Sequence, residues 1–194
     1  NYKWASQIIV LTDALKKYMQ ESFEIQPDRL RVIPNASDPS RFFPRERTDS
    51  RKKLGLPEDS FCLLYMGSYH RQQGVDCVLP LCKELKDRIP NLRFLMTGAG
   101  KAKEELEAEI HKSGLQNHFH FTGSLPPDQL GEAIGATDIA FSPVHPEEAW
   151  RTELTFPQKI VEYIACGVPV LAMGYSQVQK EMITENGCGT LIDP

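Results

Sequence analysis

The sequence predicts an α/β fold, a parallel sheet with helices on both faces. From residue 61 onward, short apolar runs alternate with segments whose apolar residues recur at helical spacing. Three of the apolar runs end in loops that contain glycine, which is typical of the ligand-binding edge of such a sheet. One stretch, residues 155–173, joins a helix directly to a buried strand and is the centre of the predicted domain.

Composition limits the class of protein. The 194 residues suffice for one sizeable core with at most one appendage. The net charge of −4 argues against nucleic acid as a partner. Five cysteines without a CxxC pair fit a reducing compartment, and we find no signal peptide or membrane-spanning run. We therefore expect a cytoplasmic protein, with a peripheral position at the inner membrane face as an alternative for the full-length protein.

Residues 1–44 are expected to lead into the domain rather than to build it. Ile8–Leu11 is a short apolar run typical of a strand, and Thr12 can cap the helix that follows. A second strand is expected at Leu30–Pro34, before the turn-rich stretch Asn35–Pro44. Strands without their parent sheet expose edges, so residues 1–44 should pack back on the domain or pair two chains into a homodimer.

The charged run Arg45–Lys53 is expected to be a solvated connection into the main domain. Strands and helices should then alternate to the end of the chain. The predicted strands are Phe61–Met66, Leu92–Thr97, His118–Phe121, Ile139–Pro143, Val168–Met173 and one within Gly187–Asp193. The predicted helices lie at residues 75–89, at Lys101–Ser113 with Gly114 as its cap, and around residues 130–134.

The stretch TFPQKIVEYIACGVPVLAM, residues 155–173, has clear start and stop signals. Pro157 suits the first position of a helix, where its missing N–H has no partner. Gly167 is placed to end the helix in a left-handed conformation, and Pro169 prevents its continuation. The apolar face comprises Ile160, Val161, Ile164 and Ala165, and another face carries Gln158, Lys159, Glu162 and Cys166.

Lys159 and Glu162 are the candidate binding pair on this helix. They lie three residues apart on one face, one turn from the helix N-terminus. Free N–H groups and a partial positive charge at that terminus favour a phosphate. A carboxylate one turn further along can accept two hydrogen bonds from a ribose diol. The simpler alternative is a surface pair at helical spacing.

The segment PQKIVEYIACGVPVLA closely resembles P-x-K-x-x-E-Y-M-A-x-G-x-P-V-x-A of the retaining glycosyltransferases of family four. The resemblance implies the C-terminal, Rossmann-like half of a GT-B fold. It implies that Glu162 holds the ribose of a nucleotide sugar and that the backbone around Phe156 and Gln158 meets the diphosphate. It also implies that residues 1–44 end an acceptor domain and form a hinge, and that residues 45–194 are a donor domain truncated at its C-terminus.

Further landmarks of that family occur in the same order along the chain. The hinge resembles V-I-P-N-G-V-D, with Ala36 and Ser37 in place of Gly-Val. Three loops resemble the family segments L-Y-x-G-R-L, V-G-x-G and F-x-G-x-V-P, and they are expected to meet the donor. Their residues here are Gly67-Ser68, Gly98-Ala99-Gly100 and Gly123-Ser124-Leu125. The order of about seven landmarks is a stronger signal than any single glycine.

The resemblance also departs from the family at charged positions. Where the family places an arginine and a lysine on the diphosphate, this chain has Ser68 and Gln73, and Arg71 is the nearest replacement. Many members carry a first glutamate near the reacting sugar, and the matching residue here is Leu154. Glu153, one position away, is the candidate catalytic residue beside Glu162. The P-x-K-x-x-E-Y subgroup often lacks that first glutamate, so activity is not excluded.

Other site chemistries fit the sequence less well. The run Gly98–Lys103 lacks the third glycine of a dinucleotide fingerprint, and the next strand ends at Thr122 without an acidic residue. His118 and His120 should share one exposed strand face, and two ligands do not make a metal site. The cysteines, including Cys166 in the key helix, have the character of small core residues.

Three hypotheses follow for the function. The first is the donor-binding half of an enzyme that moves a sugar from a nucleoside diphosphate sugar to a hydroxyl acceptor. It needs no cofactor or metal, because helix N–H groups and Lys159 would stabilise the departing diphosphate. The acceptor, a glycan, lipid or small molecule, would bind the missing domain, so the fragment alone should be inactive. The alternatives are a non-catalytic nucleotide-binding module and an interaction protein with a degenerate site.

Overall fold

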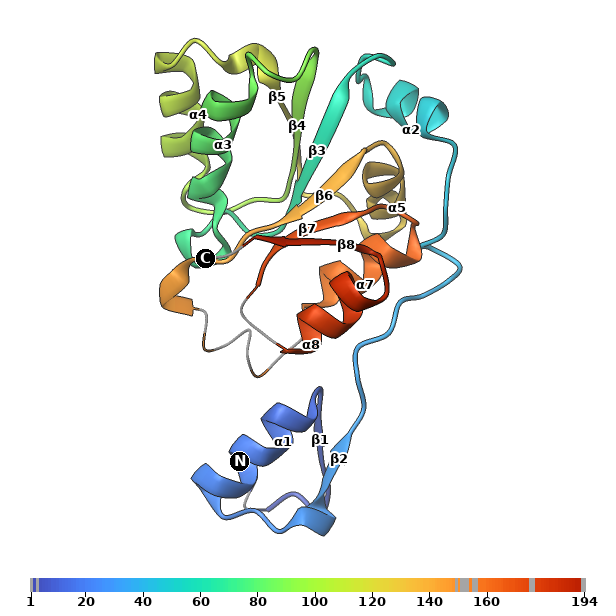
Figure 1. Cartoon of the computed structure of the whole chain (residues 1–194), viewed down its shortest axis with the longest axis vertical. Coiled ribbons are helices and arrows are strands. Elements are labelled where there is room, and N and C mark those ends of the chain that lie inside the picture. Colours follow the sequence, from blue (N-terminus) through green and yellow to red (C-terminus); the bar gives the residue numbers. More distant parts are fainter. Residues whose placement is uncertain are drawn as a thin grey trace.

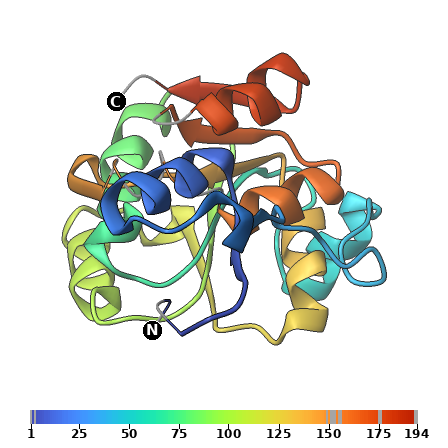
Figure 2. The same ribbon diagram turned by 90° about the horizontal axis from the view of Figure 1, so that it is seen from below.

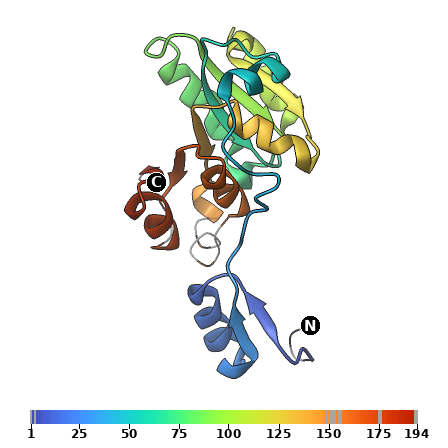
Figure 3. The ribbon, with the colours of Figure 1, turned by 90° about the vertical axis from the view of Figure 1, so that its right-hand side faces the viewer.

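The computed structural model describes residues 2, 4–148, 150, 154, 157–174 and 177–192. A small N-terminal lobe and a larger α/β domain are joined by one extended segment (Figures 1 and 3). The lobe consists of strand β1, Ile8–Val10, helix α1, Asp13–Phe23, and strand β2, Leu30–Val32. The two strands pair in parallel. The Thr12 hydroxyl accepts the Leu15 N–H at 3.0 Å, which confirms the predicted helix cap.

The α/β domain is built on a sheet of six strands that all run in parallel. Their order is β5-β4-β3-β6-β7-β8. Such connections place the starts of the following helices at the carboxyl edge of the sheet. The strands are β3 Phe61–Met66, β4 Leu92–Thr97, β5 Phe119–Gly123, β6 Ile139–Ser142, β7 Val170–Met173 and β8 Gly189–Ile192.

Helices cover both faces of this sheet (Figures 1 and 2), so the predicted fold class is confirmed. Cys62 and Leu64 of β3 face a core shared with α2, α5 and α7, whereas Leu63 and Tyr65 face a core shared with α3 and α4. A strand buried on both faces explains the continuous apolar run. The helices are α2 Arg47–Leu54, α3 Val78–Leu85, α4 Lys103–Lys112, α5 Pro127–Gly135, α7 Gln158–Ala165 and α8 Gln177–Gln179, the last continuing as a π-helix, Lys180–Glu185.

The charged run after the hinge is not a solvated connection, so that prediction is wrong. It forms α2, and the Arg51 side chain is buried against α5 and β6. The Arg51 guanidinium donates to Asp138 Oδ2 at 2.6 Å and to the Ala136 carbonyl at 3.0 Å. The same Asp138 oxygen accepts the Cys62 N–H at 2.7 Å. A buried arginine is paired in this way because an unpaired charge in the interior is very costly.

One further expectation needs correction, and one element was not predicted. His118 does not share a strand face with His120, because it ends a 3₁₀ turn, Gln116–His118, and its Nδ1 contacts the Leu92 carbonyl at 3.0 Å. The helical segment Gln177–Glu185 was not expected, because QVQKEMITE contains few apolar residues. Its Ile183 is nevertheless fully buried in the core beside α7 and β7.

Candidate functional site

The three glycine-containing loops lie side by side at the carboxyl edge of β3, β4 and β5. The Gly67 N–H donates to the Thr97 carbonyl at 3.0 Å, and the Gly98 N–H donates to the Gly123 carbonyl at 2.9 Å. Gly98 has a φ of +136°, and a Cβ there would lie 1.9 Å from the Gly67 carbonyl oxygen. Gly98 is therefore required for the contact between two loops, whether or not it also meets a ligand.

Tyr65 fixes the loop that follows β3. Its side chain is fully buried, and its hydroxyl donates to the Ser68 carbonyl at 3.0 Å and contacts the Gln73 carbonyl at 3.4 Å. Ser68 and Gln73 themselves are exposed. Tyr65 was not predicted as a site residue. The available signal was a tyrosine within a buried strand, whose hydroxyl must find a partner in the loop beyond it.

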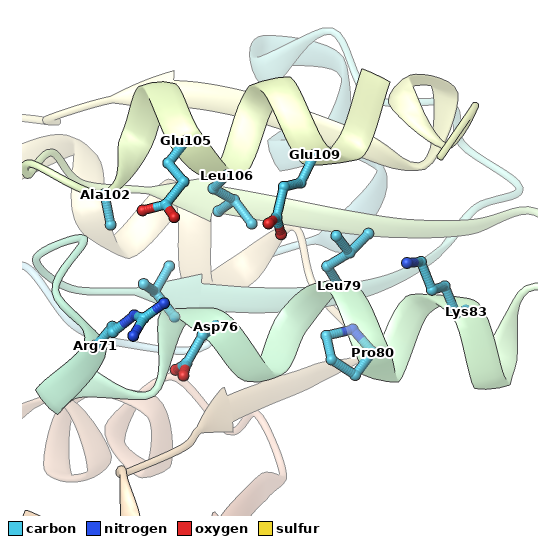
Figure 4. A pocket seen from close by; sticks show the side chains of 10 residues that line it. Arg71, Asp76, Leu79, Pro80, Lys83, Ala102, Glu105, Leu106 and Glu109 are labelled. Carbon is cyan, nitrogen blue, oxygen red and sulfur yellow. The ribbon is translucent and has the colours of Figure 1, made fainter. Parts of the chain in front are cut away.

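Arg71 lies in this loop and lines a groove between α3 and α4 (Figure 4). The groove has a volume of about 180 Å³, and Leu79 and Leu106 contribute apolar walls. Asp76 and Glu105 also line it, so acidic groups share the groove with Arg71. The role of Arg71 on a diphosphate stays a prediction.

The start of α7 offers free backbone donors. The helix begins at Gln158 with Pro157 as its N-cap, one residue later than predicted, and no side chain caps this end. The first N–H groups of a helix have no partner within it, and those of Gln158 and Lys159 have no acceptor among the described residues, so they can meet a ligand. Gly167 has a φ of +72° and ends the helix as predicted. Phe156 and Glu153 lie outside the described residues, and their roles stay predictions.

The ammonium group of Lys159 is buried and has no hydrogen-bond partner among the residues that the structure describes. It lies 5.7 Å from the centre of the Tyr65 ring. Burial lowers the pKa of this ammonium to about 8. Among the described residues it forms no ion pair with Glu162, although the two lie three apart on one helix. The alternative of a surface ion pair therefore does not describe this lysine.

Glu162 is half-buried one turn further along α7. Burial raises the pKa of its carboxyl above the ordinary value, and a hydrogen bond from Gln158 acts in the opposite direction. The Gln158 side-chain Nε2 lies 3.3 Å from Glu162 Oε1 and 2.8 Å from the Ala36 carbonyl oxygen. The side chain of Gln158 was not predicted to act, because the hinge carbonyl lies 122 positions away in the sequence.

The remaining predicted residues occupy different environments. Cys166 is 4% exposed and packs in the core, as expected of a small core residue. Ser124 is exposed, whereas Leu125 packs against the same core. The Leu154 carbonyl accepts a hydrogen bond from the Thr12 hydroxyl, so the N-terminal lobe contacts the segment just before α7. Their roles in donor binding stay predictions.

The arrangement is suited to an anion that is attached to a diol. Free N–H groups and an unpaired ammonium favour phosphate oxygens, and the carboxylate of Glu162 can accept hydroxyl donors. Within the described parts of the chain, no three histidine, cysteine or carboxylate side chains gather as metal ligands. No helix among the described residues has the length and apolarity needed to cross a membrane.

Comparison with known sequences gives relatives that are named as glycosyltransferases. The chain is 28% identical over 173 residues to the 2-deoxystreptamine glucosyltransferase of Streptomyces kanamyceticus, covering 88% of this chain and 43% of the relative. It is 25% identical over 195 residues to the lipopolysaccharide glucosyltransferase WaaG of Escherichia coli, covering 97% of this chain and 49% of the relative. The chain thus spans about half the length of these relatives.

Comparison with solved structures gives similar folds among the same kind of protein as the sequence relatives. The crystal structure of WaaG superposes with a TM-score of 0.77 at 25% identity, covering 96% of this chain and 49% of that one. The structure of HepE from Anabaena with UDP and glucose superposes with a TM-score of 0.79 at 20% identity, covering 99% and 50%. These similarities match the C-terminal half of a GT-B fold. Residues 46–194 match the profile of the glycosyl transferases group 1, and the chain belongs to this family.

Proposed function

We propose that this chain is the donor-binding part of a retaining glycosyltransferase. It binds a nucleoside diphosphate sugar, and the complete protein transfers the sugar to a hydroxyl acceptor. The observation that carries this proposal is the buried ammonium of Lys159, which lies in the first turn of α7 and has no hydrogen-bond partner within the described parts of the chain.

A buried ammonium without a partner is unfavourable unless an anion can join it. The diphosphate satisfies this need, since the free N–H groups of α7 and the helix dipole favour the same negative charge. Glu162 would repel a phosphate but accept hydrogen bonds from the ribose hydroxyls one turn away. The helix therefore sets the direction in which the ligand lies, with the diphosphate at the helix start and the ribose beside Glu162.

Protein groups alone supply positive charge in this proposal. Stabilisation of the departing diphosphate by N–H groups and Lys159 does not require a metal ion. We also propose that the sugar is transferred with retention of its anomeric configuration, because the chain resembles the retaining glycosyltransferases of family four. The acceptor, a glycan, lipid or small molecule, would contact the rest of the protein, because the chain spans about half of its relatives.

The neighbouring structures suggest where to begin the search for the donor. HepE was crystallised with UDP and glucose and also with UDP-glucose, and two curated relatives are glucosyltransferases. UDP is therefore the first probe, with GDP and ADP for comparison. Sugar transfer by the intact protein would distinguish an enzyme from a non-catalytic nucleotide-binding module.

Calorimetry with the tightest-binding diphosphate and its nucleoside tests the site. Lys159→Ala should weaken the diphosphate much more than the nucleoside, because only the diphosphate presents the matching charge. Glu162→Gln removes a charged acceptor, and hydrogen bonds to charged groups contribute about 1.5–3 kcal/mol, so affinity should fall roughly tenfold or more. Lys112→Ala removes an exposed charge at the end of α4 and is the matched control. Equal binding by wild type and Glu162→Gln would show that the ribose is held elsewhere.

A further inference from the structure

The side-chain amide of Gln158 connects the hinge to the carboxylate of the donor site. Its Nε2 lies 2.8 Å from the Ala36 carbonyl oxygen and 3.3 Å from Glu162 Oε1. A glutamine amide has two N–H donors, and here each one has an acceptor. The first acceptor belongs to the segment that leads out of the N-terminal lobe. The second belongs to the residue proposed to hold the ribose.

This amide is the only hydrogen-bond partner of the Glu162 carboxylate among the described residues. The side chain of Glu162 is half-buried, and the hydrogen bond from Gln158 is the one that favours its ionised form. A carboxylate has about four acceptor positions, so one bond to Oε1 leaves room for two ribose hydroxyls. Gln158 can thus orient Glu162 without competing for all of its acceptor capacity.

A second contact joins the N-terminal lobe to the same short segment. The Thr12 hydroxyl, which caps α1, donates to the Leu154 carbonyl four residues before Gln158. The lobe therefore contacts Leu154, and the hinge contacts Gln158 at the start of the helix that carries Lys159 and Glu162. A change in the angle between lobe and domain must disturb one or both of these contacts.

We propose that Gln158 is a positioning residue that links hinge geometry to donor binding. It holds Glu162 in the orientation that binds ribose while the Ala36 carbonyl anchors its amide, and it loses this hold when the hinge moves away. This inference rests on the proposed function of Glu162. By reciprocity, a donor that prefers the anchored arrangement must also stabilise the hinge in it.

Binding of UDP to variants of the intact protein tests the link to Glu162. Gln158→Met removes both hydrogen bonds at similar side-chain length and should weaken UDP about threefold to tenfold. Gln158→Glu cannot donate and places a second carboxylate beside Glu162, so it should weaken UDP further. In a Glu162→Gln background, the effect of Gln158→Met should largely disappear, because the two residues act on the same ligand group. Gln129→Met, at an exposed glutamine in the first turn of α5, is the matched control.

Hydrogen exchange of peptides from residues 35–44 tests the link to the hinge. UDP should slow exchange of this segment in the wild type and in Gln129→Met, and slow it clearly less in Gln158→Met. A purely structural role for Gln158 would change exchange without UDP and leave the effect of UDP intact.

The outcomes separate this inference from the proposed function. If wild type binds none of UDP, GDP and ADP, the proposed function and this inference both fail. If wild type binds UDP and Glu162→Gln weakens it, but Gln158→Met binds like wild type, only this inference fails. Additive effects of Gln158→Met and Glu162→Gln would also overturn it, since Gln158 would then act independently of the carboxylate.

Discussion

The ammonium of Lys159 faces the ring of Tyr65 at 5.7 Å from its centre, and no other described residue forms a hydrogen bond with it. A cation near an aromatic face gains about 0.5–2 kcal/mol, which is less than the hydration it loses on burial. This imbalance explains why burial lowers the pKa of Lys159 to about 8. The hydroxyl of the same tyrosine holds the loop after β3. Tyr65 thereby joins the lysine to the loop.

The affinity for UDP should fall as pH rises through about 8. Above that pH the free protein loses the Lys159 proton, and only the charged ammonium neutralises the diphosphate. Binding then requires uptake of a proton, so the dissociation constant should rise by up to about tenfold per pH unit. Calorimetry at pH 7, 8 and 9 would measure this slope, with uridine as the uncharged comparison.

Lys159→Arg is the control for that prediction. A guanidinium stays charged throughout this range, so the variant should show a nearly flat dependence of UDP affinity between pH 7 and pH 9. The same slope in wild type and Lys159→Arg would contradict the assignment of the titration to Lys159. A dependence as strong for uridine as for UDP would show that the titrating group does not sense the diphosphate.

Binding of UDP should survive chelation of divalent cations. The proposed charge partners of the diphosphate are N–H groups and Lys159, so removal of metal leaves them in place. Calorimetry with and without EDTA should give dissociation constants that agree within about twofold, an energy difference well below that of one hydrogen bond. Loss of binding in EDTA, with recovery on addition of magnesium or manganese, would refute metal-independent binding.

The fold could be predicted because its signals are local and repeated. Phe61–Met66 and Leu92–Thr97 were expected as strands and have these bounds in the structure, since both are continuous apolar runs within a doubly covered sheet. The caps at Thr12 and Gly167 were likewise visible as single residues with a definite backbone role.

The details of the site depend on contacts between distant residues. Lys159 and Glu162 were candidates from helical spacing and from the family resemblance. Spacing could not show that the ammonium lacks a partner, or that Gln158 reaches the Ala36 carbonyl. Arg51 gives the same lesson, because a charged run looks solvated until Asp138, 87 positions later, is placed beside it.

Arg51→Met should destabilise the protein by about 3 kcal/mol or more. It leaves Asp138 largely buried with only the more exposed Arg47 as an ion-pair partner among the described residues, and removal of one member of a buried ion pair typically costs about 3–5 kcal/mol. For a chain of this size the melting temperature should fall by about 6–12 °C. Arg88→Met removes an exposed pair with Glu84 and should shift it by less than about 2 °C. Similar shifts for both variants would contradict a structural role for the Arg51–Asp138 pair.

Gly98→Ala should be much more damaging than Gly123→Ala, although both glycines have positive φ. At Gly98 a Cβ would lie 1.9 Å from the Gly67 carbonyl oxygen, so the loop after β3 or the loop after β4 must move. Backbone strain and overpacking together should cost roughly 2–5 kcal/mol. At Gly123 the φ is +71° and no atom lies within 4 Å of the new Cβ, so only about 1–2 kcal/mol of strain is expected.

Thermal unfolding of Gly98→Ala and Gly123→Ala measures the difference in stability directly. Calorimetry with UDP measures how the displaced loop affects binding. Gly98→Ala should also weaken UDP binding, since it displaces Gly67 and the loop that Tyr65 holds beside Lys159. Equal melting temperatures for the two variants would mean that the loops after β3 and β4 separate at little cost. The close approach of Gly67 and Gly98 would then not be what fixes this edge of the sheet.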